Sequence, residues 1–310
     1  MPRSFWRREK MKIAITGATG FLGRYILRWL VREGHFCRCW KRFNSDISGL
    51  ENLGGKVEWV EGDLGDEGSQ KRLLRGVDAV IHAALARPKE LQFRASPGKD
   101  LMEFLHLNLM GSLSLIDFSK KIGIDRFIFI STCAVHEVIL DDRPLDEAHP
   151  LWALSHYGAY KASVEKFIHS FGFGEGWNIC AVRPTGIFGL THPAEQSKWF
   201  DLIKRAKKGG RISVATGGKE VHAADVAKTV SLLLKSNGIA GQAYNCYDMY
   251  IADQEVARIA SEILNSNCII EDLNKGPKNQ IDTQKIKNLG MTFGGKELLR
   301  KTIEEIVELI

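Results

Sequence analysis

Two short segments of this 310-residue chain contain residues whose types and spacing suit them to chemistry. Residues 16–23 read TGATGFLG and place three glycines between a short apolar run and an amphipathic one. Tyr157 and Lys161 stand four positions apart near the middle of the chain. The first segment suits a phosphate group, and the second suits the transfer of a proton.

The glycine segment has the pattern of a turn that holds a pyrophosphate. Gly17 allows a tight turn, Gly20 lets the backbone approach the ligand without a Cβ, and Gly23 lets the helix pack close to the sheet. The N-terminus of the following helix then faces the phosphates with free N–H groups. The alternative interpretation is an ordinary glycine-rich connection between a strand and a helix.

The second segment pairs a phenol with an ammonium group. On a helix, side chains four residues apart lie on the same face, so Lys161 would stand beside Tyr157. The unperturbed pKa of tyrosine is about 10, so its phenol needs a nearby cation to exchange a proton near neutral pH. Tyr160 is the nearest competitor, but its side chain is expected to point roughly 100° away from that of Lys161. Together, and in this order, the two segments indicate a hydride-transfer enzyme.

The residues after the second predicted strand bear on which dinucleotide binds. A fold selective for NAD usually places a carboxylate there, about 20 residues beyond the glycines, to hold the ribose 2′-hydroxyl. Lys41 and Arg42 occupy that place, and both cations could bind a 2′-phosphate. NADP(H) is therefore expected, and NAD(H) is the alternative if both cations belong to a solvated turn. Asp63 and Leu64, after the third strand, are expected at the adenine end.

Alternating strand and helix patterns must position these segments. Strands are predicted at 12–16, 36–40, 57–60, 79–83, 127–131 and 179–182, and helices at 21–32, 101–121, 157–171, 196–208, 224–234 and 254–264. This alternation indicates an α/β fold of the Rossmann type, a doubly wound parallel sheet with a smaller C-terminal substrate lobe.

The same patterns predict three parts of the chain. Residues 1–10 contain four basic residues and one acidic residue, a net charge of 4 − 1 = +3, and are expected to be a disordered extension. Residues 11–183 are expected to form the dinucleotide-binding Rossmann domain. Residues 184–310 are expected to form mainly the substrate-binding lobe, with some segments that return to the core.

Composition narrows the class of protein. The chain is 44% hydrophobic and 26% charged, and it lacks both an apolar run long enough to span a bilayer and a secretion signal, so a cytoplasmic protein with no integral membrane segment is expected. The net charge of +6 is modest and does not indicate nucleic-acid binding. Six scattered cysteines are expected to be free thiols, namely Cys37, Cys39, Cys133, Cys180, Cys246 and Cys268. No histidine motif indicates a metal site.

From residue 12 to about 289, the chain resembles the extended branch of the short-chain dehydrogenase/reductase superfamily, the NAD-dependent epimerase/dehydratase family. The resemblance depends on several motifs in a fixed order. These are TGATGFLG at 16–23, GDL at 62–64, VDAVIHAA at 77–84, Asn108 in the stretch that ends at Gly111, ST at 131–132, YGAYK at 157–161, RPTGIFG at 183–189 and HAADVA at 222–227. Members often dimerise through two long helices, here 101–121 and 157–171, which suggests a homodimer.

The resemblance implies a role for each motif. Tyr157 would be the general acid/base, Lys161 would favour the phenolate and hold the nicotinamide ribose, Thr132 would bond the reacting oxygen, and Asn108 would steady the proton relay. The non-catalytic alternatives are that Thr132 caps the strand and that Asn108 is a helix-interior amide bonded to backbone. The implied coenzyme-binding residues are Gly17, Thr19, Gly20, Phe21, Leu22, Gly23, Lys41, Arg42, Asp63, Leu64, Ala83, Ala84, Lys161, Pro184 and Thr185.

Departures from the family pattern narrow the reaction. Dehydratases follow the active-site threonine with an acidic pair and decarboxylases keep a glutamate there, but this chain has Cys133 and Ala134, so neither reaction is expected. Residues 216–222 contain no arginine for a substrate diphosphate, which weakens a nucleotide-sugar assignment. The candidate residues for a small-molecule substrate are His136, Trp152, His156, Thr185, His192 and Trp199, of which the aromatic ones could equally be packing residues.

Three functions remain open. The first is an NAD(P)(H)-dependent oxidoreductase that acts on a carbonyl or a secondary alcohol. The second is a nucleotide-sugar 4-epimerase that keeps NAD tightly bound. The third is a non-catalytic NAD(P)-sensing protein, against which the intact Tyr157 and Lys161 argue.

Overall fold

A computed structural model of the chain describes residues 10–86, 101–271 and 276–310. Residues 1–9, which make up most of the predicted basic extension, lie outside the described residues. Among the helices that are described, none is long and apolar enough to cross a membrane. All six cysteines fall within the described ranges and are free thiols, as predicted.

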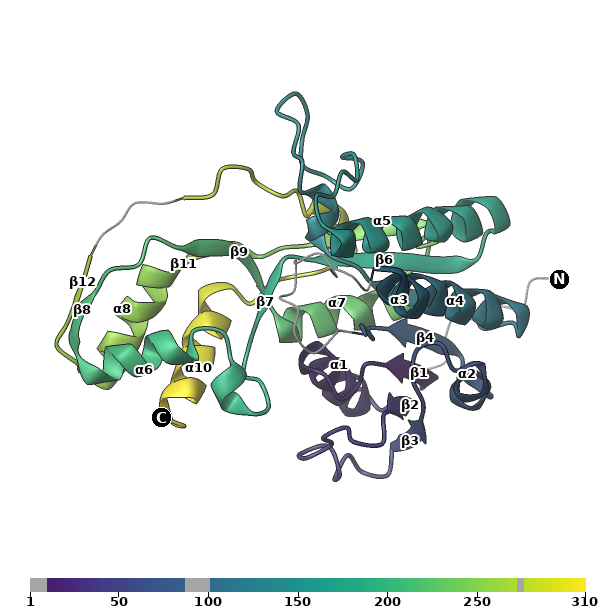
Figure 1. Cartoon of the computed structure of the whole chain (residues 1–310), viewed down its shortest axis with the longest axis horizontal. Coiled ribbons are helices and arrows are strands. Elements are labelled where there is room, and N and C mark those ends of the chain that lie inside the picture. The colour runs from purple at the N-terminus through teal and green to yellow at the C-terminus, as the bar shows by residue number, and fades with distance from the viewer. Residues whose placement is uncertain (1–9, 87–100, 272–275) are drawn as a thin grey trace.

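Seven parallel strands form one central sheet in the order β10-β6-β5-β4-β1-β2-β3 (Figure 1). The chain moves outward from β1 through β2 to β3 and then returns to the other side of β1 with β4. Ligands of such sheets bind beside this reversal, at the carboxyl ends of the strands. The predicted doubly wound sheet is confirmed. Its strands are β1 (Lys12–Thr16), β2 (Phe36–Lys41), β3 (Val57–Glu61), β4 (Ala79–His82), β5 (Arg126–Ile130), β6 (Asn178–Pro184) and β10 (Gln242–Cys246).

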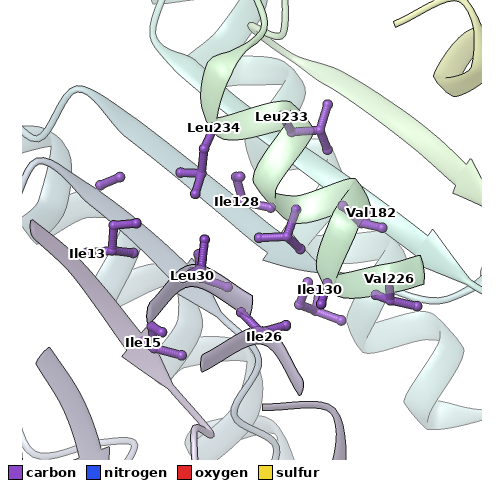
Figure 2. Close-up of a cluster of buried hydrophobic side chains, with 14 of the residues drawn as sticks. Ile13, Ile15, Ile26, Leu30, Ile128, Ile130, Val182, Val226, Leu233 and Leu234 are labelled. Carbon is purple, nitrogen blue, oxygen red and sulfur yellow. The ribbon is translucent and has the colours of Figure 1, made fainter. Parts of the chain in front are cut away.

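Both faces of the inner strands β1, β4 and β5 are buried, which explains why these strands are mostly apolar, whereas the edge strand β3 has exposed glutamates. In β1, Ile13 and Ile15 pack into one buried cluster, whereas Ala14 between them packs into another. Two helices that contact each other, α1 (Phe21–Arg32) and α7 (Ala223–Lys235), cover the first face. Figure 2 shows their side chains meeting the sheet, with Ile26 and Leu30 from α1 and Val226, Leu233 and Leu234 from α7.

Helices α2 (Glu67–Leu74), α4 (Gly111–Lys121) and α5 (His156–His169) contribute to the cluster on the opposite face. The helix predicted at 101–121 is divided into α3 (Leu101–Leu105), a π-helical turn η2 (His106–Met110) and α4. The helix predicted at 157–171 starts one residue earlier, and after His169 it passes into a second π-helical segment, η4 (Ser170–Gly174). Sequence periodicity located both helices but gave no sign of these π turns.

Helix α9 (Gln284–Lys287) contacts β10 of the main sheet, and most of the remaining elements form a smaller lobe beside it (Figure 1). Helices α6 (Phe200–Lys208), α8 (Asp253–Leu264) and α10 (Gly295–Val307) share one hydrophobic core. A three-stranded sheet of β11 (Met249–Ala252), β9 (Gly217–His222) and β7 (Gly186–Phe188) lies next to them, and β8 (Gly210–Ile212) pairs with β12 (Cys268–Ile270). The division at residues 183 and 184 stays a proposal; α7 and β10 are segments beyond it that return to the main sheet.

Helix α6 begins later than predicted. Residues 196–208 were expected to be helical, but Gln196 ends a short 3-10 turn, η5 (Ala194–Gln196), and Trp199 has a φ of 68°. A left-handed residue cannot belong to a right-handed helix, so the helix starts at Phe200.

Candidate active site

A cleft of about 1380 Å³ follows the carboxyl ends of β1, β2, β4, β5 and β6 and extends to the lobe strands β7 and β9. Tyr157 and Thr132 both line it. So do all fifteen residues expected to bind the coenzyme, from the glycine turn at 17–23 to Thr185. The structure therefore brings the two chemical segments of the sequence into one cavity, and the individual coenzyme contacts remain predictions.

The glycine turn is shaped by crowded backbone. Gly17 has a φ of 74°, and a Cβ at this position would lie 2.8 Å from the backbone of Ala83. A Cβ at Gly23 would overlap the Gly17 carbonyl group, because α1 packs closely on the turn. At Gly20, by contrast, a Cβ would meet only the Gly17 oxygen at 3.4 Å. Gly20 thus keeps the start of α1 open to the cleft, as a cradle for a pyrophosphate requires.

Two cations and a hydroxyl group gather at the end of β2. Lys41 is the last residue of this strand, Arg42 follows it, and both line the cleft. Ser45 also lines it, and its Oγ accepts a hydrogen bond of 2.9 Å from the Arg42 backbone N–H. The sequence did not single out Ser45, because a lone serine in a polar turn carries no signal. Lysine, arginine and serine side chains are all able to bind a phosphate group.

Helix α5 carries the phenol and the ammonium. Its first turn is capped by Ser155, whose Oγ accepts a hydrogen bond of 3.1 Å from the Gly158 backbone N–H. Lys161 donates a hydrogen bond of 2.7 Å to the carbonyl oxygen of Ile130, and its Nζ lies 5.8 Å from the centre of the Tyr157 ring. The end of β5 therefore holds the ammonium beside the phenol. Its positive charge favours the phenolate form of Tyr157.

The expected separation of Tyr160 from Lys161 is wrong. The lysine Nζ lies 5.0 Å from the centre of the Tyr160 ring, nearer than to the centre of the Tyr157 ring. The Tyr160 hydroxyl nevertheless points into the core, 3.3 Å from Ser112 Oγ, where burial raises its pKa. Tyr160 is not among the residues that line the cleft. Tyr157 is thus the tyrosine of this helix that faces the cavity.

Thr132 and Asn108 have different surroundings. Thr132 lines the cleft, and its Oγ1 accepts a hydrogen bond of 3.1 Å from Ala134 N–H at the start of the 3-10 turn η3 (Cys133–His136). Asn108 is fully buried and does not line the cleft. Its amide instead holds the backbone of Ala86, accepting from the N–H at 2.9 Å and donating to the carbonyl at 3.0 Å. Asn108 fixes a wall of the cleft, as the backbone-bonding alternative describes.

Two of the six candidate substrate residues line the cleft, His136 and Thr185. His136 Nε2 lies 3.1 Å from Arg183 Nη1, and its Nδ1 lies 3.1 Å from the Pro150 carbonyl oxygen. Arginine only donates, so Nε2 accepts and Nδ1 donates, which fixes a neutral ring. Burial and the Arg183 charge lower the pKa of His136 to about 4. Both ring nitrogens are engaged in the wall and are poorly placed to exchange protons with a substrate.

The other four candidates lie away from the cleft lining. Trp199 is buried in the hydrophobic core of the lobe, which is the packing role that the sequence left open. His192 lies at the surface, with Nε2 3.1 Å from Asp46 Oδ2. Trp152 and His156 are exposed. A single sequence does not show which aromatic residues of a lobe face its cavity, because that depends on how the lobe folds back.

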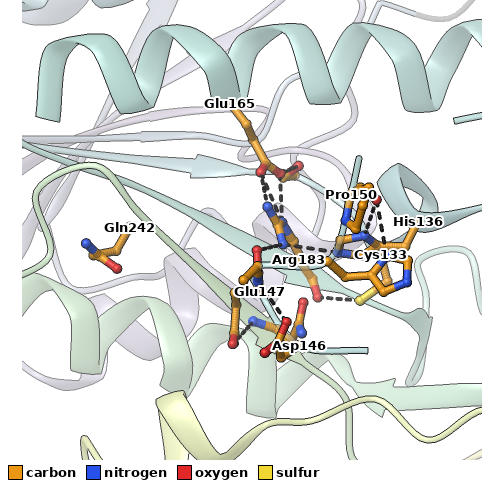
Figure 3. A network of polar contacts seen from close by, with 12 residues as sticks. Cys133, His136, Asp146, Glu147, Pro150, Glu165, Arg183 and Gln242 are labelled. Carbon is orange, nitrogen blue, oxygen red and sulfur yellow. Dashed lines mark hydrogen bonds and ion pairs between the residues drawn. The ribbon is translucent and has the colours of Figure 1, made fainter. Parts of the chain in front are cut away.

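A buried ion pair supports the wall of the cleft (Figure 3). Glu165 of α5 and Arg183 of β6 are both almost fully buried, and Oε2 of the first lies 2.6 Å from Nη2 of the second. Arg183 also donates to the carbonyl oxygen of Glu147 at 3.1 Å, and Ser131 Oγ donates to Glu165. This network ties α5 to β5 and β6. Sequence reasoning missed it, because charged residues in a helix and a strand are normally solvated.

Comparison with known proteins supports this scaffold. The model of the NAD dependent epimerase/dehydratase family matches residues 13–246. A 4-hydroxy-2-methyl-3-oxo-4-farnesyl-3,4-dihydroquinoline-1-oxide ketoreductase from Stigmatella aurantiaca is 29% identical over 243 residues, 76% of this chain and 67% of that protein. A dTDP-D-glucose 4,6-dehydratase from Homo sapiens is 24% identical over 328 residues, 94% of this chain and 89% of that protein. The structure of UDP-glucuronic acid 4-epimerase from Bacillus cereus, in complex with UDP-glucuronic acid and NAD, has a TM-score of 0.77 at 21% identity and covers 97% of this chain and 100% of that chain.

These relatives include a reductase, a dehydratase and an epimerase, so kinship alone does not select one reaction. The expectation against dehydration therefore depends only on Cys133 and Ala134, where no carboxylate stands. The matched region contains the glycine turn, the two cations at the end of β2 and the pair on α5. The chain thus belongs to the NAD-dependent epimerase/dehydratase family, an enzyme family of the extended short-chain dehydrogenase/reductase superfamily.

Proposed function

We propose that the protein is an NADP(H)-dependent oxidoreductase that interconverts a carbonyl compound and a secondary alcohol. One observation carries this proposal: a single cleft is lined by the glycine turn, by Lys41 and Arg42, and by Tyr157 with Lys161. The dinucleotide would lie with its pyrophosphate on the turn and its 2′-phosphate toward the two cations. Bound NADP(H) supplies the hydride for reduction, or accepts it in the reverse direction.

Tyr157 moves the proton that balances the hydride. In reduction its phenol donates a proton to the carbonyl oxygen, and in oxidation its phenolate accepts the proton of the hydroxyl group. Lys161 lowers the cost of the phenolate through its charge, and the carbonyl oxygen of Ile130 keeps the ammonium in place. Thr132 Oγ1 accepts from the Ala134 N–H, and its own O–H would donate to the reacting oxygen.

Two observations favour a reductase. Cys133 and Ala134 follow Thr132, so neither of these two positions offers a carboxylate to remove water from a substrate. The relative from Stigmatella aurantiaca is described as a ketoreductase.

The second candidate is a nucleotide-sugar 4-epimerase with permanently bound NAD. It is favoured by the likeness in fold to the Bacillus cereus epimerase, whose structure contains a UDP-sugar and NAD. Both candidates use the same phenol. They differ in whether the coenzyme leaves after each turnover.

The purified protein decides between the two. We expect it to retain no stoichiometric NAD and to oxidise NADPH when supplied with members of a panel of aldehydes and ketones, followed by nicotinamide absorbance. Stoichiometric NAD in the purified protein, together with epimerisation of a UDP-sugar, would replace the first candidate by the second.

A further inference from the structure

A buried carboxylate stands at the lobe end of the cleft. The side chain of Glu220, on β9, is only 3% exposed, yet Glu220 lines the cavity. Its carboxylate forms an ion pair with Lys198, which lies just before α6 and also lines the cavity. A carboxylate is placed in such surroundings at a cost, which its pairing with the lysine offsets.

Two glycines make room for this carboxylate. Gly186 of β7 stands opposite Glu220 in the parallel pairing of β7 with β9, and Gly218 lies two residues before it on β9. A Cβ at Gly186 would overlap both carboxylate oxygens of Glu220, and a Cβ at Gly218 would overlap Oε1. Both glycines line the cleft as well. The carboxyl group therefore lies in the space next to both glycines.

The charge of Glu220 changes what this end of the cleft accepts. The Lys198 ammonium is already paired with the Glu220 carboxylate. A phosphoryl group that enters this end of the cleft would therefore meet the buried negative charge of Glu220. Lys219 and Lys278 also line the cavity, and burial lowers the pKa of Lys219. An uncharged hydroxyl or carbonyl group meets no such cost. It accepts a hydrogen bond from the lysine, and a hydroxyl also donates one to the carboxylate.

The neighbouring wall suits an uncharged, largely apolar molecule. Ile139, Leu145 and Ile281 line the cleft. They belong to a small hydrophobic cluster with Cys133 and Tyr247. The backbones of Leu145 and Ile281 pair in an isolated parallel β-bridge. Cys133 follows Thr132 directly, so this apolar wall begins beside the candidate catalytic hydroxyl.

We propose that Glu220 determines substrate specificity. Its charge disfavours the binding of phosphorylated substrates at the lobe end of the cleft and favours uncharged carbonyl or alcohol compounds that carry a polar group on an apolar body. This inference rests on the proposed function, because it takes the cleft as the substrate site. It separates the protein from relatives whose solved structures hold UDP-sugars.

The test is calorimetric titration with UDP and with uridine, at saturating NADPH or NAD so that neither probe enters the coenzyme site. Wild type is expected to bind UDP no more tightly than uridine. Glu220→Gln keeps the shape of the side chain, removes its charge and releases Lys198, so it should bind UDP about tenfold more tightly than wild type does. Lys198→Gln, the matched control, leaves the carboxylate charged and should show no such gain.

Two results would overturn the proposal. One is wild-type protein that already prefers UDP to uridine by about tenfold, which needs no variant to detect. The other is Glu220→Gln that still binds coenzyme, and is therefore folded, but gains no affinity for UDP. Neither readout involves hydride transfer, so failure here is distinguishable from failure of the oxidoreductase assignment.

Discussion

The charged residues of this cleft differ in how deeply they are buried. The Lys161 ammonium is held by the carbonyl oxygen of Ile130 and lies beside a phenol that is only 7% exposed. Lys41 and Arg42 lie at the more open end of the cleft. The first arrangement suits proton exchange at a fixed point, and the second suits recognition of a charged group on a ligand that comes and goes.

The choice of coenzyme is tested by exchanging both cations. The double variant Lys41→Asp/Arg42→Ser should weaken NADPH binding by about a hundredfold relative to NADH, because a 2′-phosphate would then meet a carboxylate in place of two cations. Fluorescence titration of each coenzyme measures the ratio. Lys71→Ala, a basic residue on α2 away from the cleft lining, is the control and should leave the ratio unchanged. An unaltered ratio of the two affinities in the double variant would show that neither cation contributes to the choice of coenzyme.

At the scale of elements, hydrogen bonds to the carboxylate of Glu137 fix the start of α5. Glu137 follows η3, and its Oε2 accepts hydrogen bonds from the backbone N–H groups of Leu154 at 2.6 Å and Ser155 at 2.8 Å. Ser155 Oγ also donates to this carboxylate at 3.0 Å while it caps the helix. The segment that begins with Thr132 and the helix turn that carries Tyr157 are thereby fixed to each other.

Loss of this cap should reduce turnover more than coenzyme binding. Ser155→Ala is expected to lower the free energy of unfolding by about 1 kcal/mol. It should also lower kcat by about tenfold, because small misplacements of a reacting group are costly. Ser163→Ala, a half-buried serine on the same helix that does not line the cleft, is the control and should change neither quantity. Equal kcat values in the two variants would show that the cap does not position Tyr157.

The sequence predicted elements where local pattern decides them. Strand β1 and helix α1 were found because apolar runs and glycine spacing are local signals. The lobe strands β7 and β9 were not predicted, since they are short and their pairing joins residues far apart in the chain. The opposition of Gly186 and Glu220 follows from that register. The burial of Glu165 against Arg183 likewise appears only once α5 and β6 are packed together.

At the scale of the whole molecule, buried histidines link stability to pH. Burial lowers the pKa of His82 to about 3 and those of His136 and His222 to about 4, with Lys161, Arg183 and Lys301 as secondary causes. In the unfolded chain these groups titrate near pH 6.5. Between the folded-state and unfolded-state pKa values, these histidines bind protons in the unfolded state but not in the folded state. Their contribution to stability is complete above about pH 6.5 and is lost as the pH falls toward 4, by up to about 1.4 kcal/mol per pH unit for each histidine.

His222→Asn isolates one of these groups. His222 Nδ1 caps α7 by accepting from the Ala224 N–H, and asparagine is a good cap, so the helix start is preserved. The free energy of unfolding, measured by urea denaturation from pH 7 to 4.5, should fall less steeply in this variant than in wild type. His156→Asn removes an exposed histidine and should keep the wild-type slope. Identical slopes in all three proteins would contradict the proposed linkage.

The most direct test of the account compares Tyr157→Phe with Tyr160→Phe, two tyrosines on one helix of which only the first lines the cleft. With a carbonyl substrate from the panel, turnover of Tyr157→Phe should fall by about a thousandfold or more at unchanged NADPH affinity, because the proton donor is gone. Tyr160→Phe loses one long hydrogen bond to Ser112 and should keep most of its activity. Substantial turnover by Tyr157→Phe, or an equal loss in both variants, would contradict the assignment of the phenol as the acid/base of this cleft.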